Sequence, residues 1–240
     1  MYNDFALIYD RFQEIDYDEF IKFYNKILGK GAMTIIDLGC GTGEITYRLA
    51  GCGHNVIGVD ISEEMLTAAQ DKASFADKNI MFIKGDMTEF VYGSGADAVI
   101  SSLDCVNYLT DISEVKAAFE CVYNSLNPGG VFIFDINSKY KLKNILGSNT
   151  FVYEDEDAYC VWDCAYFDED KICSFDLNFF VRGSDGRFDR YYEYQEERAY
   201  SIEEITAALK STGFKEVEVY SDLTMAPPNE KSERIFFTAS

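Results

Sequence analysis

The chain has 240 residues, 48% of them hydrophobic and 15% aromatic, which is enough to bury the core of one large domain. No run of about 18 apolar residues occurs, which argues against a membrane-spanning helix, and the first residues lack the basic and apolar regions of a secretory signal. The net charge of −21 disfavours nucleic-acid and anionic-membrane partners and favours neutral or cationic small molecules. We therefore expect a cytoplasmic protein with one domain over 1–240.

The seven cysteines contain no C-x-x-C pair, and the only histidine is His54. A metal site built from Cys160, Cys164 and Cys173 is conceivable, but strand alternation would equally bury these thiols as small apolar side chains. Without a signal peptide, disulfides are not expected either. The sequence therefore predicts no bound metal.

The first predicted element is a helical cap over 1–30, in which apolar residues at helical spacing form a stripe over 16–28 before Gly29 and Gly31 end the helix. From Met33 to Ile136, short apolar strands alternate with helices. The predicted strands cover 33–38, 55–59, 80–84, 96–101 and 130–135. This alternation predicts a doubly wound, Rossmann-like α/β fold with a parallel sheet.

Two helices in this region have recognisable starts. Ser62 can cap the helix that carries Met65, and Asp111 with Glu114 has the spacing of a capping box. The second helix is expected to end at a turn formed by 127–130.

The pattern changes after Asn137. Residues 151–200 are rich in aromatic, valine and acidic residues, and turn signals predict three antiparallel strands, roughly 158–167, 171–182 and 187–199. The acidic run 154–157 is interpreted as a solvated edge, although it could also attract a cationic ligand. We interpret 138–200 as an antiparallel β insertion.

The C-terminal part returns to the alternating pattern. Ser201 and Glu204 form a second capping box for a helix that ends near Gly213. Strands over 216–220 and 234–239 complete the chain.

A glycine-rich turn follows the first strand, in the sequence Asp37-Leu38-Gly39-Cys40-Gly41-Thr42-Gly43-Glu44. Glycines let the backbone approach a ligand closely, and the N-terminus of the next helix offers free N–H groups. The dinucleotide fingerprint requires a third glycine where this chain has Glu44. This difference argues against a nicotinamide-dependent oxidoreductase.

Two carboxylates follow the next two strands. Asp60 can accept hydrogen bonds from both hydroxyls of a ribose, and Asp86 can bind the amino group of an adenine on which Met87 packs. Ligands of open α/β sheets bind at the carboxyl edge, where these turns are expected to meet.

In combination, these motifs resemble the class I S-adenosylmethionine-dependent methyltransferases. The resemblance covers about residues 1–136 and rests on the glycine turn, 58–66, 85–87 and 126–130. Further blocks, at 2–10, 104–109 and 198–205, are similar to a bacterial small-molecule subgroup related to sugar and glycine N-methyltransferases. The resemblance implies a seven-stranded sheet in the order 3-2-1-4-5-7-6.

The resemblance also implies a set of contacts with S-adenosylmethionine. The glycines would line its methionine part, Asp60 would hold the ribose, Ile61 and Met87 would enclose the adenine, and Asp86 would bind the adenine amino group. Ser102 would lie near the methionine end, and Tyr9 and Tyr17 would close over the cofactor, although both tyrosines could equally be ordinary packing residues. The residues implied to contact the cofactor are Tyr9, Tyr17, Asp37, Gly39, Gly41, Gly43, Asp60, Ile61, Met65, Asp86, Met87 and Ser102.

Methyl transfer is an in-line displacement that depends on alignment and exclusion of water. Tyr9 and Asp104 are the candidate catalytic residues, and Asp104 could instead be a helix cap or a loop carboxylate. The insertion would roof the acceptor site, with Gln195 where relatives often carry a histidine. Residues 102–105 lack the Asn/Asp-Pro-Pro-Tyr motif of nucleic-acid base methyltransferases, which disfavours that chemistry. The expected acceptor is a small molecule, methylated at nitrogen or oxygen. The alternative is a non-catalytic, cofactor-binding regulator.

Overall fold

Two β-sheets organise the part of the chain that the computed structural model describes, which is residues 12, 15–76, 80–93 and 95–240. Sheet A has the strand order β10-β11-β5-β4-β1-β2-β3, and sheet B has the order β6-β7-β8-β9. The strands of sheet A are β1 (Thr34–Leu38), β2 (Asn55–Asp60), β3 (Met81–Lys84), β4 (Ala96–Ser101), β5 (Leu126–Asn137), β10 (Val217–Ser221) and β11 (Arg234–Ala239).

The strand order of sheet A confirms the prediction. From β3 it runs 3-2-1-4-5, and it then continues with β11 and β10, the last two strands of the chain. The first five strands are parallel, whereas β11 pairs antiparallel with both β5 and β10. The carboxyl ends of the parallel strands therefore meet at one edge of the sheet.

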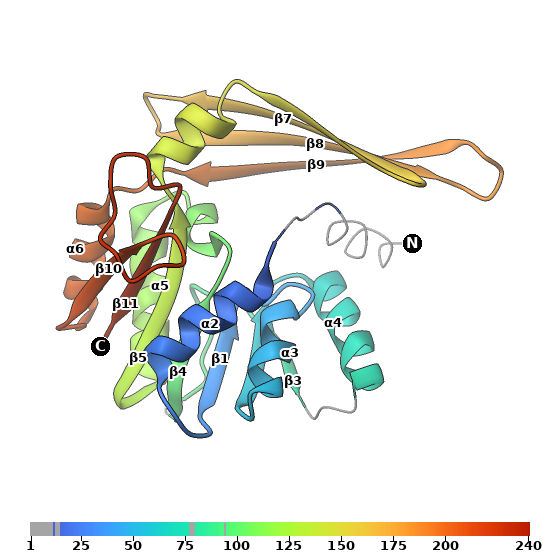
Figure 1. The fold of residues 1–240 in the computed structure, drawn as a ribbon. Coiled ribbons are helices and arrows are strands. Elements are labelled where there is room, and N and C mark those ends of the chain that lie inside the picture. Colours follow the sequence, from blue (N-terminus) through green and yellow to red (C-terminus); the bar gives the residue numbers. More distant parts are fainter. Residues whose placement is uncertain (1–11, 13–14, 77–79, 94) are drawn as a thin grey trace.

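Helices cover both faces of sheet A (Figure 1). They are α2 (Tyr17–Leu28), α3 (Glu44–Gly51), α4 (Glu63–Ala76), α5 (Ile112–Ser125) and α6 (Ile202–Thr212). Successive strand residues point to opposite faces: Ile35 packs with α2 and α3, and Ile36 belongs to the core with α5 and α6. The apolar strand sequences thus fill two separate cores.

The predicted helix caps are confirmed. The Ser62 hydroxyl accepts a hydrogen bond from the Met65 amide at 3.2 Å. Both capping boxes, on α5 and α6, are formed. Helix α2 confirms the C-terminal part of the predicted cap, whereas residues 1–11, 13 and 14 of that cap lie outside the described residues.

Two predictions of local structure were wrong. Residues 127–130 do not form a turn outside the sheet, because β5 already starts at Leu126 and the strand passes through them with a shift in register. Gly129 has a φ of +83°, which glycine adopts without strain, and it lies within this irregular part of the strand. The sequence predicted three strands in the insertion, but the structure has a further one, since Thr150–Asp155 forms β6 and pairs with β7.

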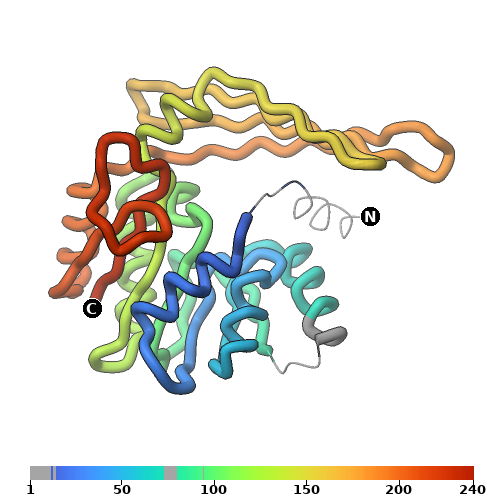
Figure 2. Tube along the Cα trace, viewed as in Figure 1, coloured from blue at the N-terminus to red at the C-terminus, as the bar shows by residue number. Residues whose placement is uncertain are grey.

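Sheet B lies across the carboxyl edge of sheet A. Figure 1 shows it above that edge, and Figure 2 shows the yellow-to-orange segment as a separate layer over the rest of the chain. Its strands are β6 (Thr150–Asp155), β7 (Ala158–Phe167), β8 (Ile172–Arg182) and β9 (Phe188–Arg198). A π-helical segment, η2 (Lys141–Leu146), connects the two sheets and packs on the inner face of sheet B.

The three cysteines of the insertion lie in this inner face. Cys160, Cys164 and Cys173 are buried beside Leu142 and Phe175. Burial raises the pKa of Cys160 to about 11 and those of Cys164 and Cys173 to about 12, so the thiols remain protonated at neutral pH. Among the described residues, no three or more His, Cys, Asp or Glu side chains are arranged to hold a metal ion.

No helix in the described ranges is both long and apolar enough to cross a membrane.

Candidate active site

Three loops from the carboxyl ends of β1, β2 and β3 meet at one place. The Gly39 amide donates to the Val59 carbonyl at 2.7 Å, and the Gly41 amide donates to the Asp60 carboxylate at 2.8 Å. The Gly85 amide donates to the Asp60 carbonyl at 2.9 Å. The structure therefore brings together the glycine turn, Asp60 and the loop of Asp86, as their positions in the sequence predict.

The glycines of the turn differ in their surroundings. Gly39 has a φ of +76°, and a Cβ there would lie 2.6 Å from Sγ of Cys105, so only glycine allows that close approach. A Cβ on Gly41, at φ +52°, would meet no atom within 4 Å, so that the Gly41 backbone faces open space. Gly43, at φ +83°, is the N-cap of α3 and provides no side-chain cap.

Asp60 and Asp86 keep acceptor capacity at this edge. The Asp60 carboxylate accepts from the Gly41 amide at Oδ2 and from the Ser62 amide at Oδ1, at 2.9 Å, and the Ile61 amide also interacts with it; a carboxylate has about four lone-pair sites in all. Thr88 donates twice to Oδ1 of Asp86, at 2.8 and 2.7 Å, whereas Oδ2 accepts none of the hydrogen bonds found among the described residues. Beside them, the Ile61 side chain is 64% exposed, which is unusual for an isoleucine.

Other predicted contact residues hold the surrounding elements together. Asp37 is buried and accepts a hydrogen bond from the Thr46 hydroxyl of α3, and burial raises its pKa to about 7. The Ser102 hydroxyl lies 2.7 Å from that of Tyr24 in α2. The Tyr17 ring is 4.9 Å from the Arg48 guanidinium, beside the first turn of α3.

The two predicted methionines come from the loop after β3 and from α4. Met87 lies close to the glycine turn, since its Cε would be 3.7 Å from a Cβ on Gly39. Met65 is half-buried in the first turn of α4. Tyr9 lies outside the described residues.

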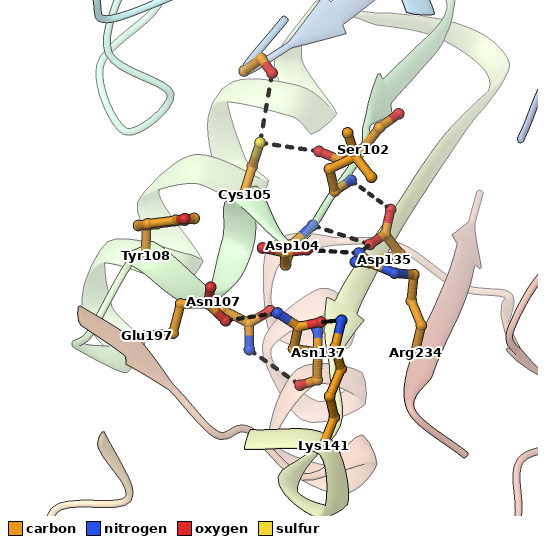
Figure 3. Close-up of polar contacts among 12 residues, drawn as sticks. Ser102, Asp104, Cys105, Asn107, Tyr108, Asp135, Asn137, Lys141, Glu197 and Arg234 are labelled. Atoms are coloured by element: carbon orange, nitrogen blue, oxygen red, sulfur yellow. Dashed lines mark hydrogen bonds and ion pairs between the residues drawn. The ribbon is translucent and has the colours of Figure 1, made fainter. Parts of the chain in front are cut away.

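The loop after β4 connects the glycine turn to the space under sheet B. Sγ of Cys105, in the short 3₁₀ helix η1 (Cys105–Tyr108), lies 3.5 Å from the Gly39 carbonyl. Leu103 and Asp104 have φ values of +61° and +57°, and their amides donate to the buried carboxylate of Asp135 at 2.9 and 3.0 Å. A left-handed conformation is unfavourable for a leucine such as Leu103, and the Asp135 carboxylate holds both residues in it (Figure 3).

Asp104 lies in a network of charged side chains from three elements. The Arg234 guanidinium of β11 contacts the Asp104 carboxylate at 2.7 Å and also binds Asp135 of β5 (Figure 3). Asp135 is fully buried, and Asp104 and Arg234 are mostly buried. Asp104 is thus neither a solvent-exposed loop carboxylate nor a side-chain cap of η1.

A cavity of about 330 Å³ lies between this network and sheet B. Its walls are largely aromatic and aliphatic, with Trp162, Phe175, Leu177 and Phe179 from β7 and β8. Its polar lining residues include Asp104, Asn137, Lys141, Glu197 and Arg234. Because the Asp104–Cys105 segment touches both Gly39 and this lining, the cavity adjoins the glycine turn.

Glu197 is the most deeply buried acid of the insertion. It is 2% exposed, and its Oε2 accepts a hydrogen bond from Nδ2 of the Asn137 side chain at 2.8 Å. Asn107 fixes Asn137 by accepting from its backbone N–H at 2.9 Å. Burial and the nearby charge of Asp104 raise the pKa of Glu197 well above its usual value.

Comparison with known proteins identifies the family. A family model described as a methyltransferase domain matches residues 35–130, which contain all three loops. A protein of Geobacillus sp. (strain WCH70) that is named as a methyltransferase is 38% identical over 99% of this chain and 98% of its own length. The crystal structure of an S-adenosylmethionine-dependent methyltransferase from Clostridium acetobutylicum ATCC 824 has a TM-score of 0.89 at 32% identity, covering 99% of this chain and 98% of that one. This chain is a class I S-adenosylmethionine-dependent methyltransferase.

The methyltransferase also shares its fold with a more distant protein. The sugar N-methyltransferase KedS8 from Streptoalloteichus sp ATCC 53650 is 21% identical, with a TM-score of 0.79 over 97% of this chain and 90% of its own. This likeness includes the insertion, since it extends over nearly the whole chain.

The residues at the edge of the methyltransferase sheet fit S-adenosylmethionine. The open space at Gly41 gives room for a ligand against the backbone. The available lone pairs of Asp60 and Asp86 match ribose hydroxyls and an adenine amino group, and exposed Ile61 offers an apolar surface for a ring.

Several residues of the methyltransferase site were not found from the sequence. Strand alternation placed Glu197 on one face of its strand but did not show which face lines the cavity. Arg234 and Asp135 are 99 positions apart and meet only because β11 pairs beside β5. No motif marks Lys141 or Asn137.

Proposed function

We propose that the enzyme transfers the methyl group to a nitrogen or oxygen of a small molecule bound in the cavity under sheet B. The observation that carries this proposal is the cavity itself. It combines apolar walls with a few fixed polar groups, as small-molecule sites generally do. It also adjoins the glycine turn through Asp104 and Cys105.

The cofactor would lie along the carboxyl edge of sheet A. We infer that Gly39, Gly41 and Gly43 line its methionine part, that Asp60 holds the ribose, and that Asp86 binds the adenine amino group. Ile61, Met65 and Met87 would contact the adenine side. When bound, S-adenosylmethionine supplies an electrophilic methyl carbon, and its sulfur keeps the electron pair of the broken bond.

Two buried residues would act from behind the cofactor loops. Asp37 and Ser102 are almost inaccessible to solvent and bind Thr46 and Tyr24. We therefore assign them the role of shaping the loops that surround the ligand. Tyr17 would order the first turn of α3 through Arg48, and Tyr9 remains a predicted contact.

The protein's own contribution to rate would be alignment and exclusion of water. Holding two reactants in a near-attack arrangement can lower a barrier by about 7–11 kcal/mol. Asp104, fixed by Arg234 and by its left-handed backbone, would position the acceptor from the cavity floor. Sheet B would cover the acceptor and keep water out.

The small-molecule assignment has two further supports. KedS8, which shares the fold over nearly the whole chain, is named as a sugar N-methyltransferase. The net charge of −21 disfavours a nucleic-acid acceptor.

A cavity-filling variant tests the proposal. Leu177 lines the cavity, so Leu177→Trp should occupy the acceptor space and leave the cofactor loops intact. We expect loss of methyl transfer to a panel of small amines and alcohols, followed with labelled cofactor. The affinity for S-adenosylhomocysteine, measured by calorimetry, should stay unchanged.

Val152→Trp is the matched control, because Val152 also lies in sheet B but is 65% exposed. This variant should keep both transfer and cofactor binding. Wild-type turnover in Leu177→Trp would place the acceptor elsewhere. A wild-type protein that binds the cofactor but methylates no compound of a broad metabolite panel would favour the regulator alternative.

A further inference from the structure

We propose that Glu197 holds the protonated nitrogen of the acceptor and then takes its proton, so that the cavity selects an amine over an alcohol. This inference rests on the proposed function, because it assigns a substrate class and a catalytic residue to the same cavity. Three features of the site support it: the position of Glu197, the balance of charges, and the separation of Glu197 from the nearest cation.

The position of Glu197 is fixed. The residue lies on the inner face of β9 and lines the cavity together with Asp104. Its Oε2 is held by Asn137, which is itself fixed by Asn107. A rigid, buried carboxylate beside a ligand-sized space is preorganised to bind a ligand without reorganisation of the protein.

The charges around the cavity do not balance. Among the described residues of this network, Asp104, Asp135 and Glu197 carry carboxylates, whereas Arg234 and Lys141 are the cations. Arg234 already contacts both aspartates. With all five groups ionised, one negative charge would remain uncompensated in a largely buried place, which is costly unless a cation or a proton joins it.

Lys141 does not neutralise Glu197 directly. Its ammonium donates to Oδ1 of Asn137 at 2.8 Å, and Nδ2 of the same amide donates to Glu197 (Figure 3). The amide thus lies between the two charges, and no ion pair joins them among the contacts of the described residues. Burial and the charge of Arg234 also lower the pKa of Lys141, which weakens it further as a counter-ion.

A protonated amine would compensate the charge of Glu197 and, after losing a proton, would supply the attacking nitrogen. An ammonium donates hydrogen bonds and compensates the carboxylate, but its nitrogen cannot attack until it loses a proton. The proton passes to Glu197, whose carboxylate becomes a neutral carboxylic acid, and the nitrogen recovers its lone pair. The nitrogen then forms the bond to the methyl carbon, and the product carries the positive charge. An alcohol brings no charge to compensate.

The surroundings of Glu197 favour the uptake of a proton. The groups that face it are Asp104 from the β4 loop, Lys141 from η2, Cys164 from β7 and Cys173 from β8. Burial and Asp104, which repels the Glu197 carboxylate and also hydrogen-bonds to it, raise the pKa of Glu197, whereas the Asn137 hydrogen bond and Lys141 oppose this shift. A proton and an ammonium therefore compete for the same carboxylate, and amine binding should strengthen with rising pH as Glu197 ionises.

Benzylamine and benzyl alcohol are suitable probes, since they have similar shape and differ in charge, and the cavity walls are aromatic. Their binding to the full-length protein saturated with S-adenosylhomocysteine is measured by calorimetry between pH 5 and pH 8. In wild type, we expect benzylamine to bind roughly ten- to a hundredfold more tightly than the alcohol at the upper pH.

Glu197→Gln is the decisive variant, because the amide preserves shape and can still accept from Asn137. It should lose the preference for the amine and the pH dependence, with an unchanged midpoint of thermal unfolding or a higher one. Glu196→Gln removes the same charge one residue away, on the exposed face of β9, and should retain both properties.

The outcomes separate this inference from the proposed function. If wild type binds both probes equally or neither, or if Glu197→Gln keeps the amine preference, Glu197 is not the selecting residue. In each of these cases, loss of turnover in Leu177→Trp would still support the cavity as the acceptor site. An active Leu177→Trp variant would overturn the proposed function as well.

Discussion

At the residue scale, single carboxylates each hold more than one segment of the site. Asp60 binds the amides of Gly41 and Ser62, and thereby joins the glycine turn to the start of α4. Asp135 binds two backbone amides of the β4 loop and the guanidinium of Arg234. A substitution at such a position therefore changes the shape of a loop as well as the charge of the site.

Replacement of Asp60 is expected to weaken cofactor binding. Asp60→Ala removes a hydrogen bond to a charged acceptor that is worth about 1.5–3 kcal/mol, which corresponds to a loss of roughly ten- to a hundredfold in affinity. Calorimetry with S-adenosylmethionine measures the effect. Asp60→Asn, which keeps one acceptor oxygen, should show a smaller loss. An unchanged dissociation constant in the alanine variant would remove Asp60 from the cofactor site.

For single residues, sequence patterns predicted the positions of Asp60 and Asp86 but not those of Glu197 and Arg234. Asp60 and Asp86 were predicted because each follows a strand at a fixed offset, so their neighbourhood is set by local chain geometry. Glu197 and Arg234 have no such local sign. Their meeting with Asp104 depends on how sheet B is placed over sheet A, which is a property of the tertiary structure.

At the element scale, helix starts could be predicted from the sequence because the residues of a capping motif are close together in the chain. The donors and acceptors of a capping box lie within four consecutive residues, as at Asp111–Glu114 and Ser201–Glu204. Strand β6 was missed for the opposite reason. Its acidic end suggests a solvated loop, and its partner β7 becomes visible only through the register Thr150↔Asp163 to Asp155↔Ala158.

The cap of α6 gives a test at this scale. The Ser201 hydroxyl accepts from the Glu204 amide at 3.2 Å, so Ser201→Ala should lower the free energy of unfolding by about 1 kcal/mol. Urea denaturation measures it. Ser211→Ala, at the other end of the same helix, removes only a bond from the hydroxyl to the Ala208 carbonyl and should be close to neutral. Equal effects of the two substitutions would show that the Ser201 cap contributes no more to the free energy of unfolding than the Ser211 hydroxyl does.

At the scale of the whole molecule, the charge of −21 acts on the folded state through self-repulsion. Raising the ionic strength from about 0.01 M to about 0.1 M shortens the Debye length from about 30 Å to about 10 Å. We therefore expect the midpoint of thermal unfolding to rise over this range. Sodium chloride titrations followed by circular dichroism provide the measurement. A falling midpoint would show that screened ion pairs outweigh the repulsion.

By itself, the sequence determined the order of the strands of sheet A, the family and the loops that meet at the carboxyl edge of that sheet. Those features depend on periodicity, glycine spacing and residues directly after strands, all of which are local in the chain. The tertiary structure decided the cavity under sheet B, the position of the insertion above it and the charged network of Asp104, Glu197 and Arg234. These features arise between segments that are far apart in sequence, where burial and charge compensation, rather than local pattern, select which side chains meet.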